Sequence, residues 1–323
     1  MKRFALIGAA GFVAERHIRA IKETGNELVC AMDTFDVMGR MDSYFPEAEF
    51  FTSEKELVQF LQLAKEKGEP VDYISICSPN YLHFKHIELA LKNACDVICE
   101  KPLVVDSTDL DKIKQLEAAT GKKVYTVLQL RYHPTIVQLR DQIQKSDKDF
   151  FEVDLQYITS RGKWYFKSWK GDANKSGGIA TNIGIHFFDM LNWIFGAVKE
   201  NRIESYESDK ASGFLKLEKA KVNWFLSLDS SDLPDVVSNA GKRTFRSIKV
   251  DGKEIEFSGG FTDLHTATYQ NILDGNGFGI NDARMSIELT EEIRMGNTEK
   301  REVCLKIKEW VVLRPQTKQT ENG

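Results

Sequence analysis

A lysine and a histidine from distant parts of the sequence have the chemistry needed to take a proton from an alcohol. Lys101 stands in a Glu-Lys-Pro tripeptide, whose proline restricts its own backbone and that of the lysine before it, so the amine is held on a stiff segment. His186 follows Asn182 by four residues, which places both on one face of a helix. Histidine titrates closest to neutral pH, so we predict that His186 accepts the proton and Lys101 stabilises the negative charge that develops on oxygen. The reverse assignment, with a desolvated Lys101 as the base, stays open.

Oxidation of an alcohol also needs an acceptor for the hydride, and a glycine turn near the N-terminus predicts a dinucleotide site. An apolar strand over residues 2–7 precedes the turn, and a helical stretch through residue 22 follows it. Glycines let the backbone approach a pyrophosphate, whose charge meets the amides at the helix N-terminus. The usual G-x-G-x-x-G spacing is not met, because alanine occupies the second glycine position. The residues of the turn that we expect to bind the cofactor are Gly8, Ala10, Gly11, Phe12 and Val13.

An acidic residue after the second predicted strand indicates which dinucleotide binds. Residues 27–32 form an apolar run, and Asp33 follows at the place where a carboxylate can hold the adenosine ribose 2′-hydroxyl. No arginine adjoins Asp33 in the sequence to bind a 2′-phosphate. We therefore predict NAD, and not NADP, as the cofactor.

Polar residues also follow three further predicted strands. Ser78 and Asn80 follow a buried type of strand, and Asn80 is expected to cap the next helix. Glu100 and Lys101 follow another strand, and Gln129 ends a third. The carboxyl ends of parallel strands meet at one edge of a sheet, where ligands bind, so we predict that all five residues contribute to the cofactor site. The three strands are predicted over residues 71–77, 96–99 and 123–129.

The pattern changes in the second half of the chain and predicts an antiparallel sheet. The candidate strands are not separated by helices of crossover length, and Asp251-Gly252 fits a hairpin turn. A helix is predicted over residues 179–194, with Gly178 and Gly184 leaving room for a close approach of cofactor or substrate. The strands are predicted over residues 151–160, 222–228, 243–250 and 254–257.

Together these patterns predict an α/β protein of two domains, which a length of 323 residues allows. An NAD-binding Rossmann domain with a doubly wound parallel sheet is expected over residues 1–131. A C-terminal α+β domain with an open, mostly antiparallel sheet is expected over residues 132–315, for substrate binding and oligomerisation. The polar tail over residues 316–323 is expected to be frayed.

The bulk composition argues against several kinds of partner. A formal net charge of −4 gives no reason to expect binding to nucleic acid or to an anionic membrane. No apolar run approaches the roughly 20 residues of a membrane span, and the N-terminus leads straight into a strand without a signal peptide. The five cysteines lack the spacing of a zinc site and fit buried, reduced thiols, so we predict a cytoplasmic protein without a metal.

Three motifs together resemble the glucose–fructose oxidoreductase/inositol dehydrogenase family, and the resemblance covers nearly the whole chain. They are the Glu-Lys-Pro tripeptide after a strand, Ser78-Pro79-Asn80 with His83, and Gly177-Gly178 followed by Asn182, Gly184, His186 and Asp189. The resemblance implies an NAD-dependent dehydrogenase whose C-terminal sheet mediates assembly into a homo-oligomer, a dimer or a tetramer. It also implies that His83 and Trp169 lie near the cofactor and that Arg131 and Tyr132 line the substrate cleft.

Two further details resemble a branch of that family that acts on nucleotide sugars. They are the displaced glycine of the N-terminal turn and the run from Ser176 to Trp193. Most of the wider family has aspartate where this chain has Asn182, and the branch shares the asparagine. The resemblance implies oxidation of the 3″-hydroxyl of UDP-N-acetylglucosaminuronic acid (UDP-GlcNAcA) to a ketone. That reaction lies on the route to diamino-uronic acids of bacterial surface polysaccharides, such as the O-antigen of lipopolysaccharide.

A basic and aromatic segment over residues 161–171 would suit such a substrate. Its cations suit phosphates and a carboxylate, and its aromatic rings suit the faces of a sugar. An exposed loop with aromatic anchors packed on the sheet would have the same composition, and that interpretation stays open. The residues that we expect to contact the substrate are Lys101, Arg131, Tyr132, Arg161, Lys163, Tyr165, Asn182 and His186.

Two other functions stay open. An inositol or simple sugar dehydrogenase of the same family would keep the chemistry and change the substrate, although Asn182 and the basic segment argue against it. A non-catalytic NAD-binding regulatory or scaffold protein would keep the fold without the reaction. The presence of both Lys101 and His186 argues against that function.

Overall fold

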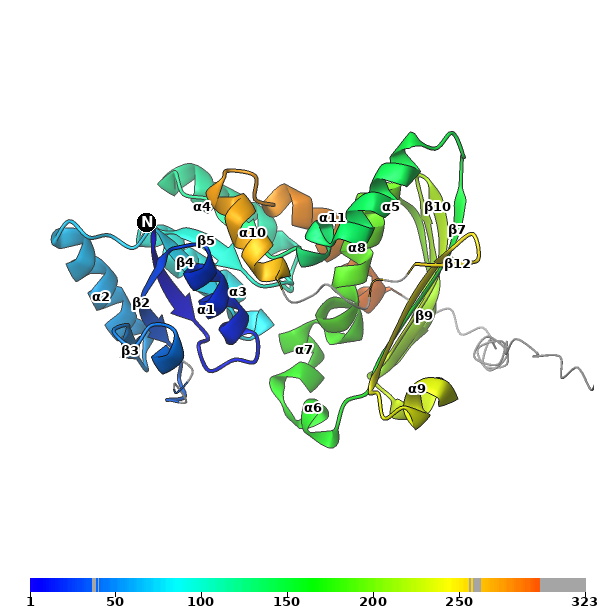
Figure 1. The fold of residues 1–323 in the computed structure, drawn as a ribbon, viewed down its shortest axis with the longest axis horizontal. Helices are drawn as coiled ribbons and strands as arrows, with labels where there is room; N and C mark the ends of the chain where they lie inside the picture. Colours follow the sequence, from blue (N-terminus) through cyan, green and yellow to red (C-terminus); the bar gives the residue numbers. More distant parts are fainter. Residues whose placement is uncertain (37–38, 40, 256, 258–262, 297–323) are drawn as a thin grey trace, which may run out of the picture.

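The computed structural model describes residues 1–36, 39, 41–255, 257 and 263–296 of the chain. Two six-stranded sheets stand towards opposite ends of an elongated molecule, with several helices between them (Figure 1). The first sheet, blue to cyan, comes from the N-terminal half of the chain, and the second, green to yellow, comes from the C-terminal half. Among the described residues, no helix is both long enough and apolar enough to cross a membrane.

All strands of the first sheet run parallel, in the order β3-β2-β1-β4-β5-β6. The order reverses between β1 and β4, and such a switch point is where doubly wound sheets bind ligands. This topology confirms the predicted Rossmann fold. The elements are β1 (Arg3–Ile7), α1 (Ala14–Glu23), β2 (Glu27–Met32), η1 (Met41–Ser43), β3 (Glu49–Phe51), α2 (Glu54–Glu66), β4 (Tyr73–Ile76), η2 (Asn80–Leu82), α3 (His83–Lys92), β5 (Asp96–Cys99), α4 (Thr108–Thr120), β6 (Val124–Thr126) and η3 (Gln129–Tyr132).

The second sheet has the order β12-β11-β7-β10-β9-β8. Its neighbours pair antiparallel except for β7 and β10, so the predicted mostly antiparallel sheet is confirmed. The elements of this half are α5 (Pro134–Lys145), β7 (Phe151–Thr159), α6 (Lys163–Lys167), η4 (Trp169–Gly171), α7 (Ala173–Ser176), the π-helix η5 (Ala180–Gly184), α8 (Ile185–Phe195), β8 (Val198–Tyr206), β9 (Lys210–Leu217), β10 (Ala220–Ser227), η6 (Ser230–Asp232), α9 (Asp235–Asn239), β11 (Thr244–Val250), β12 (Lys253–Glu254), α10 (Leu264–Leu273) and α11 (Ile280–Met295).

Helices α5 and α8 cover one face of the second sheet (Figure 1). Phe188 of α8 packs edge-on against Trp224 of β10, and the core continues through Ile136 of α5. The opposite face, turned away from the first sheet, carries no helix in the described part of the chain. The second sheet is therefore open on its outer side, as the sequence predicts.

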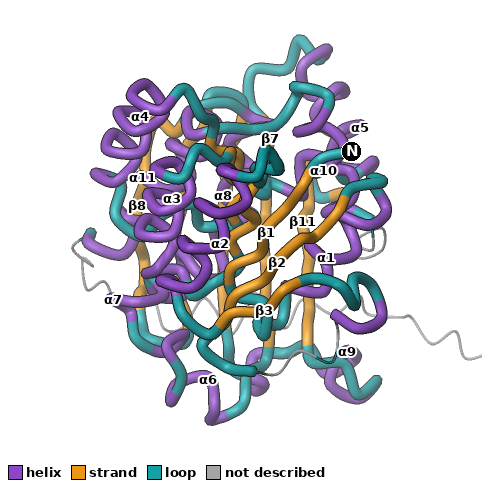
Figure 2. The backbone as a smooth tube through the Cα atoms, turned by 90° about the vertical axis from the view of Figure 1, so that its left-hand side faces the viewer, coloured by secondary structure: helices purple, strands orange, loops and turns teal. Residues whose placement is uncertain are grey.

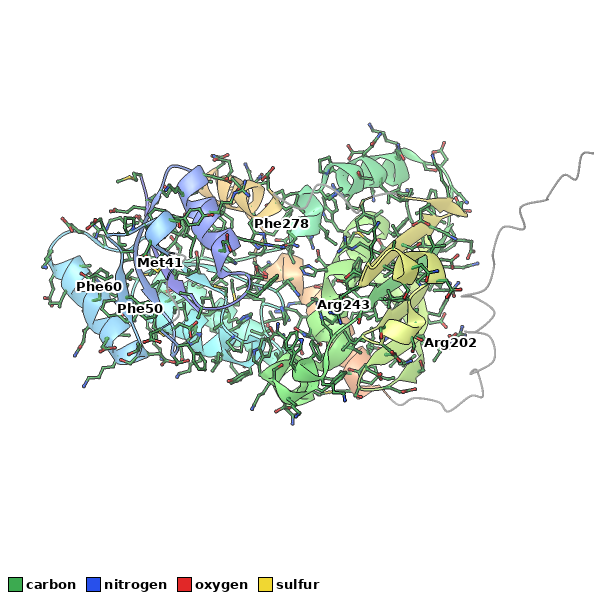
Figure 3. All side chains as sticks on the ribbon, turned by 60° about the horizontal axis from the view of Figure 1, so that its bottom comes forward. Met41, Phe50, Phe60, Arg202, Arg243 and Phe278 are labelled. Carbon is green, nitrogen blue, oxygen red and sulfur yellow. The ribbon has the colours of Figure 1, made fainter. Side chains whose placement is uncertain are left out.

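The last two helices, α10 and α11, return to the N-terminal half. Tyr269 of α10 shares a core with Ile18 of α1, and Ile287 of α11 shares the core beneath α2, α3 and α4. The two helix layers lie on opposite sides of the first sheet (Figure 2). Phe278, which precedes α11, lies between the two halves (Figure 3). The predicted domain boundary at residue 131 stays a prediction, and the one at residue 315 lies outside the described residues.

Some local predictions need correction. Asn80 does not cap the helix after it, because η2 intervenes and α3 begins at His83 with Leu82 as its N-cap residue and no side-chain cap. The helix predicted over residues 179–194 is divided into the π-helix η5 and the α-helix α8. The predicted frayed tail, residues 316–323, lies outside the described residues.

Candidate active site

A cavity of about 550 Å³ opens at the carboxyl edge of the first sheet, at the switch point between β1 and β4. All the residues that the sequence predicts to bind the cofactor line it, except Gln129, which is buried at the start of η3. The lining residues are Gly8, Ala10, Gly11, Phe12, Val13, Asp33, Thr34, Phe35, Cys77, Ser78, Pro79, Asn80, Tyr81, Leu82, His83, Glu100, Lys101, Trp169, Lys170 and Asn182.

The glycine turn after β1 has the geometry of a phosphate cradle. Gly8 has a φ of +88°, and a Cβ built there would lie 2.5 Å from the backbone nitrogen of Ser78, so only glycine fits. Helix α1 begins at Ala14, and its N-cap residue Val13 gives no side-chain cap, which leaves the first amides for an anionic ligand. The turn therefore fits a pyrophosphate, although its glycine spacing is displaced.

Asp33 holds the same turn from the end of β2. Its Oδ2 accepts a hydrogen bond of 2.9 Å from the amide of Ala10, and its Oδ1 accepts one of 3.1 Å from the amide of Phe35. Each carboxylate oxygen can accept another hydrogen bond, so Asp33 can also accept one from a ribose hydroxyl. The residues that line the cavity include no arginine for a 2′-phosphate. These features fit NAD.

A buried chain of hydrogen bonds behind Ser78 was not predicted from the sequence. The Ser78 Oγ lies 2.8 Å from Nδ1 of His86, and Nε2 of His86 lies 3.3 Å from Oε1 of Glu54. The carboxylate favours the tautomer with a proton on Nε2, so the Ser78 hydroxyl donates to Nδ1 and presents its lone pairs to the cavity. His86 contacts both partners in the fold but lies eight residues from Ser78 and 32 residues from Glu54 in the sequence, so no local pattern indicates it.

Asn80 and His83 join the cofactor edge to the segments that contain Lys101 and Asn182. The Asn80 amide donates to the carbonyl of Ser176 at 2.9 Å and to Oδ1 of Asn182 at 3.4 Å. The buried ring of His83 lies between two carbonyl oxygens, that of Pro102 at 2.7 Å and that of Ser78 at 2.9 Å. Both side chains thus lie at the cavity, as predicted, and also hold its walls together.

Lys101 lies where the large cavity meets a second, very small one. Its Nζ donates a hydrogen bond of 3.1 Å to the backbone oxygen of Asn182. Burial lowers the pKa of Lys101 to about 8, the positive charges of Lys170 and Arg161 also lower it, and the carboxylate of Glu100 opposes them. A share of the amine is therefore neutral near neutral pH.

His186 lines the small cavity together with Lys101. Burial, and then the charge of Lys101, hold the pKa of His186 well below its usual range, so its ring is neutral. The two residues come from different halves of the chain, and the fold brings both to the wall of one small cavity.

Asn182 lies in the π-helix η5, and its backbone oxygen accepts the hydrogen bond from Lys101. Its Nδ2 donates to the hydroxyl oxygen of Tyr165 at 2.7 Å. Asn182 lines the large cavity, whereas Tyr165, a predicted substrate contact, is buried in the core and lines neither cavity. The glycines around this helix do not serve a ligand, contrary to the prediction. A Cβ at Gly178 would meet the Tyr206 hydroxyl at 2.5 Å, and one at Gly184 would meet protein side chains at 2.7 Å. These glycines make room for packing.

Arg131 and Tyr132 do not line either cavity. The buried guanidinium of Arg131 forms a bidentate pair with Asp189 at 2.8 and 3.0 Å and reaches Oδ1 of Asp282 at 3.3 Å. It also stacks 4.7 Å from the ring of Phe278, which Tyr132 contacts as well. This arrangement favours a structural role over the predicted contact with substrate, because the donors of Arg131 are already occupied.

The basic and aromatic segment lies at the mouth of the site. Trp169 and Lys170 line the large cavity, and the Lys170 ammonium stands 5.5 Å from the ring centre of Trp164 and 5.7 Å from that of Trp169. Arg161 and Lys163 are exposed. Trp169 and Lys170 thus face the cavity beside Lys101, whereas the predicted substrate contacts Arg161 and Lys163 line neither cavity.

Two histidines that the sequence analysis did not select meet at Glu100. Nε2 of His17 lies 3.1 Å and Nε2 of His265 lies 2.9 Å from the same carboxylate oxygen of Glu100. His17 comes from α1 and His265 from α10, so only the tertiary structure brings them together.

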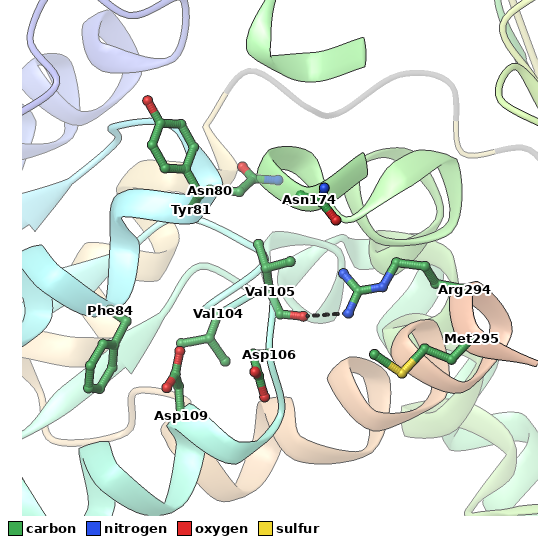
Figure 4. A pocket seen from close by; sticks show the side chains of 10 residues that line it. All are labelled: Asn80, Tyr81, Phe84, Val104, Val105, Asp106, Asp109, Asn174, Arg294 and Met295. Carbon is green, nitrogen blue, oxygen red and sulfur yellow. Dashed lines mark hydrogen bonds between the residues drawn. The ribbon is translucent and has the colours of Figure 1, made fainter. Parts of the chain in front are cut away.

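A further cavity of about 320 Å³ lies behind Asn80 and Tyr81, between α4 and the end of α11 (Figure 4). Its charged groups already have partners. The Arg294 guanidinium donates to the carbonyl of Val105, and the Asp109 carboxylate accepts from Lys112. We assign no ligand to this cavity.

Comparison with protein families agrees with this geometry. Residues 2–128 match a model described as an oxidoreductase family with an NAD-binding Rossmann fold, and residues 148–232 match the C-terminal alpha/beta domain of the same oxidoreductase family. The chain belongs to the glucose–fructose oxidoreductase/inositol dehydrogenase (GFO/IDH/MocA) family. The resemblance inferred from the motifs is thus confirmed, and this family member is an oxidoreductase with an NAD-binding domain.

Solved structures of this family resemble the whole chain. The WlbA (WbpB) dehydrogenase from Thermus thermophilus in complex with NAD and UDP-GlcNAcA is 47% identical, with a TM-score of 0.90 over 93% of this chain and 97% of that one. A second structure of it, with NAD and alpha-ketoglutarate, is 48% identical, with a TM-score of 0.90 over 94% and 98%.

Curated members of the family match shorter segments. The inositol 2-dehydrogenase of Rhizobium meliloti is 26% identical over 60% of this chain, and the D-glucoside 3-dehydrogenase of Escherichia coli is 28% identical over 42%. The matched segments span 55% and 40% of these relatives' own lengths, and 30% of a putative oxidoreductase from Bacillus subtilis.

Proposed function

We propose that this protein uses NAD to oxidise the 3″-hydroxyl of UDP-GlcNAcA to a ketone. The observation that carries the proposal is the place of Lys101, which lines both the dinucleotide-sized cavity and the small cavity that holds His186. The nature of the sugar is supported by the Thermus thermophilus dehydrogenase, which has 47% identity over nearly its whole length and was crystallised with NAD and UDP-GlcNAcA.

The residues of the glycine turn, together with Asp33 and Ser78, would hold NAD, which supplies the oxidant when bound. Lys101 in its neutral form takes the proton of the hydroxyl at Nζ, because a pKa of about 8 suits a base near neutral pH. Neutral His186 hydrogen-bonds the same oxygen and orients it. The pKa directions thus favour the alternative assignment of the two roles, in which Lys101 is the base.

The cationic segment would bind the anionic parts of the substrate. Lys170 lines the cavity, and Arg161 lies close enough to Lys101 to lower its pKa, so both charges act on the space beside the base. A diphosphate and a uronate carboxylate are the anions of UDP-GlcNAcA, and fixed cations recognise both groups. The Tyr165 hydroxyl accepts a hydrogen bond from Asn182 and so holds that side chain in place.

The proposal extends to the setting of the reaction. The open outer face of the second sheet supports a homo-oligomer, because an exposed sheet is usually covered by a partner. A 3-keto UDP-uronic acid suits a route to diamino-uronic acids of bacterial surface polysaccharides, including the O-antigen of lipopolysaccharide. The buried free thiols of Cys30, Cys77, Cys95 and Cys99 support a cytoplasmic location.

Incubation of the protein with NAD and UDP-GlcNAcA tests the proposal, with absorbance at the band of reduced cofactor and the mass of the sugar as readouts. The expected result is cofactor reduction together with a sugar lighter by two hydrogens. An arm with alpha-ketoglutarate, which is bound in the Thermus thermophilus structure, reveals whether a second oxidant is needed for turnover.

Matched substrates separate the alternatives. UDP-N-acetylglucosamine lacks the carboxylate, and equal efficiency on it would contradict a role for the cationic segment in binding the uronate. Turnover of inositol or free sugars in place of the UDP-sugar would contradict the proposed substrate and favour a polyol dehydrogenase. Binding of NAD without any redox change, under all these conditions, would favour the non-catalytic alternative.

A further inference from the structure

We propose that His17 and His265 are positioning residues for the reaction: both donate to one oxygen of Glu100 and thereby fix a negative charge beside Lys101. The inference rests on the proposed role of Lys101 as the base. It goes further because it assigns a task to two histidines that touch neither cavity and come from helices far apart in the sequence.

The geometry around Glu100 leaves its carboxylate little freedom. Its Oε1 lies 3.1 Å from Nε2 of His17 and 2.9 Å from Nε2 of His265, and its Oε2 accepts a bond of 3.2 Å from the amide of Lys101. The Glu100 side chain is 8% exposed, and those of the two histidines are 0% and 4% exposed. Three donors thus converge on one buried acceptor group.

The hydrogen-bond partners of His17 on the side away from Glu100 indicate which of its ring nitrogens carries the proton. Nδ1 of His17 lies 2.7 Å from the Tyr269 hydroxyl, which lies 2.5 Å from Oγ of Ser75. If Ser75 donates to Tyr269 and Tyr269 donates to Nδ1, the proton of His17 is on Nε2, where it points at Glu100. Both ring nitrogens of His17 then have a partner while the ring is neutral, and burial favours the neutral ring because it lowers the pKa of His17.

The consequence is a buried carboxylate that stays charged. Burial opposes its ionisation, but the hydrogen bonds from His17 and His265 overcome that effect and hold the pKa of Glu100 well below its usual range. The negative charge raises the pKa of Lys101, against burial and the charges of Lys170 and Arg161. Other titratable groups around Glu100 and Lys101 are Cys77, Cys99, His83, His186 and Tyr269.

The arrangement also links the catalytic strand end to the packing of the last helices. His17 lies on α1, a helix that packs on the first sheet. His265 lies on α10, which follows the second sheet in the sequence and packs against α1. Glu100 is thus clamped between the two, next to the residue that acts as the base.

The titration of Lys101 in the free protein tests the inference without substrate or cofactor. Protein labelled with ¹³C at lysine Cε is titrated by NMR, and the signal of Lys101 is assigned by its loss in Lys101→Arg. We expect a midpoint of about 8 for the unchanged protein. Glu100→Gln, which keeps the shape and removes the charge, should lower that midpoint by roughly one pH unit or more.

Two variants of His265 isolate the clamp. His265→Leu removes the donor and should lower the Lys101 midpoint by a smaller amount than Glu100→Gln, because His17 still holds the carboxylate. His265→Gln can keep a donor near the position of Nε2 and should leave the midpoint near that of the unchanged protein. In the Glu100→Gln background, His265→Leu should have no further effect, because the charge that it positions is gone.

Thr266→Val is the matched control on the same helix, since the Thr266 hydroxyl bonds Glu23 at the surface and does not contact Glu100. A Lys101 midpoint that is the same in His265→Leu as in the unchanged protein would overturn the inference, as would an equal effect of His265→Leu with and without the Glu100 charge. Stoichiometric zinc in the purified protein, lost in His265→Leu, would also overturn it, because a metal needs Nε2 without its proton. If the variants behave as expected but UDP-GlcNAcA is not oxidised, only the proposed substrate fails.

Discussion

The surroundings of Lys101 and His186 shift the pKa values of the two side chains by different amounts. Burial lowers the pKa of both, but that of Lys101 falls to about 8, whereas that of His186 falls well below its usual range. A base acts best when its pKa lies near the working pH, so Lys101 is the better proton acceptor. The charge of Lys101 itself contributes to the low pKa of His186, so the two residues are not independent.

Replacing Lys101 by methionine should remove the base while keeping much of the side-chain volume. We expect turnover to fall roughly 10²–10⁴-fold, the usual contribution of a general acid–base group, with NAD binding retained. The rate of NAD reduction gives the first quantity and a fluorescence titration with NADH gives the second. Lys112→Met, which removes a surface lysine paired with Asp109, is the control. Near-normal turnover in Lys101→Met would remove this residue from the chemistry.

The pH dependence of turnover distinguishes the two assignments of the base. If Lys101 is the base, only its neutral form accepts the proton, so kcat should rise with pH through a midpoint of about 8. If His186 were the base and Lys101 a charged donor, the rise would lie well below pH 6.5 and the rate would fall as Lys101 loses its charge. A profile of the second kind at saturating substrate would contradict our assignment.

At the scale of elements, the strand ends were the most predictable part of the molecule. The ends of β1, β2, β4 and β5 carry the predicted residues to one edge, because parallel strands in a doubly wound sheet must end there. Strands β8 and β9 were not predicted. Strand β8 carries charged residues along most of its length and has no buried residue, so it lacks the pattern of a half-buried strand. The three-residue β3 is too short to leave a pattern.

Other parts of the site could not be predicted because they depend on long-range contacts. An arginine such as Arg131 is a typical anion-binding residue. Only the fold shows that its guanidinium already donates hydrogen bonds to Asp189 and Asp282. The glycines near η5 were assigned to a ligand, whereas the fold places Tyr206 and Leu226 against them. The partners of Glu100 come from positions 83 residues before it and 165 residues after it, a separation that no local pattern spans.

The β1–α1 turn allows a test with a matched control. Gly8 and Gly25 both have positive φ, but a Cβ would collide with Ser78 only at Gly8, and nothing lies within 4 Å at Gly25. Gly25→Ala should destabilise the protein by about 1–2 kcal/mol through the left-handed backbone alone. Gly8→Ala should destabilise it more and should also weaken NAD binding. Denaturant unfolding and NADH titration measure both, and equal NAD affinity in the two variants would contradict the phosphate cradle.

At the scale of the whole molecule, Arg131 joins the two halves. Arg131 lies in η3, directly after the first sheet. Its guanidinium pairs with Asp189 of α8 and Asp282 of α11 and stacks on the ring of Phe278. Segment 278–279 in turn pairs with the edge of β6. Lys101 and His186, the proposed catalytic pair, also come from the two halves, so their relative geometry depends on this joint.

Removing Arg131 should therefore affect stability more than substrate binding. Arg131→Leu leaves the buried Asp189 carboxylate without its partner, and we expect a loss of about 3–5 kcal/mol in the free energy of unfolding. Arg284→Leu, on the exposed side of α11, should cost less than about 1 kcal/mol. A stable Arg131→Leu protein whose KM for the UDP-sugar rises strongly would instead support the contact with substrate that the sequence predicts.

A crystal structure of the protein with NADH and UDP-GlcNAcA bound would test the proposed roles of Lys101 and His186 most directly. We predict that the 3″-hydroxyl oxygen lies within about 2.6–3.2 Å of Lys101 Nζ and within hydrogen-bonding distance of the His186 ring. A sugar that occupies the site with this oxygen turned away from both side chains would contradict the central claim that Lys101 and His186 act on the same oxygen.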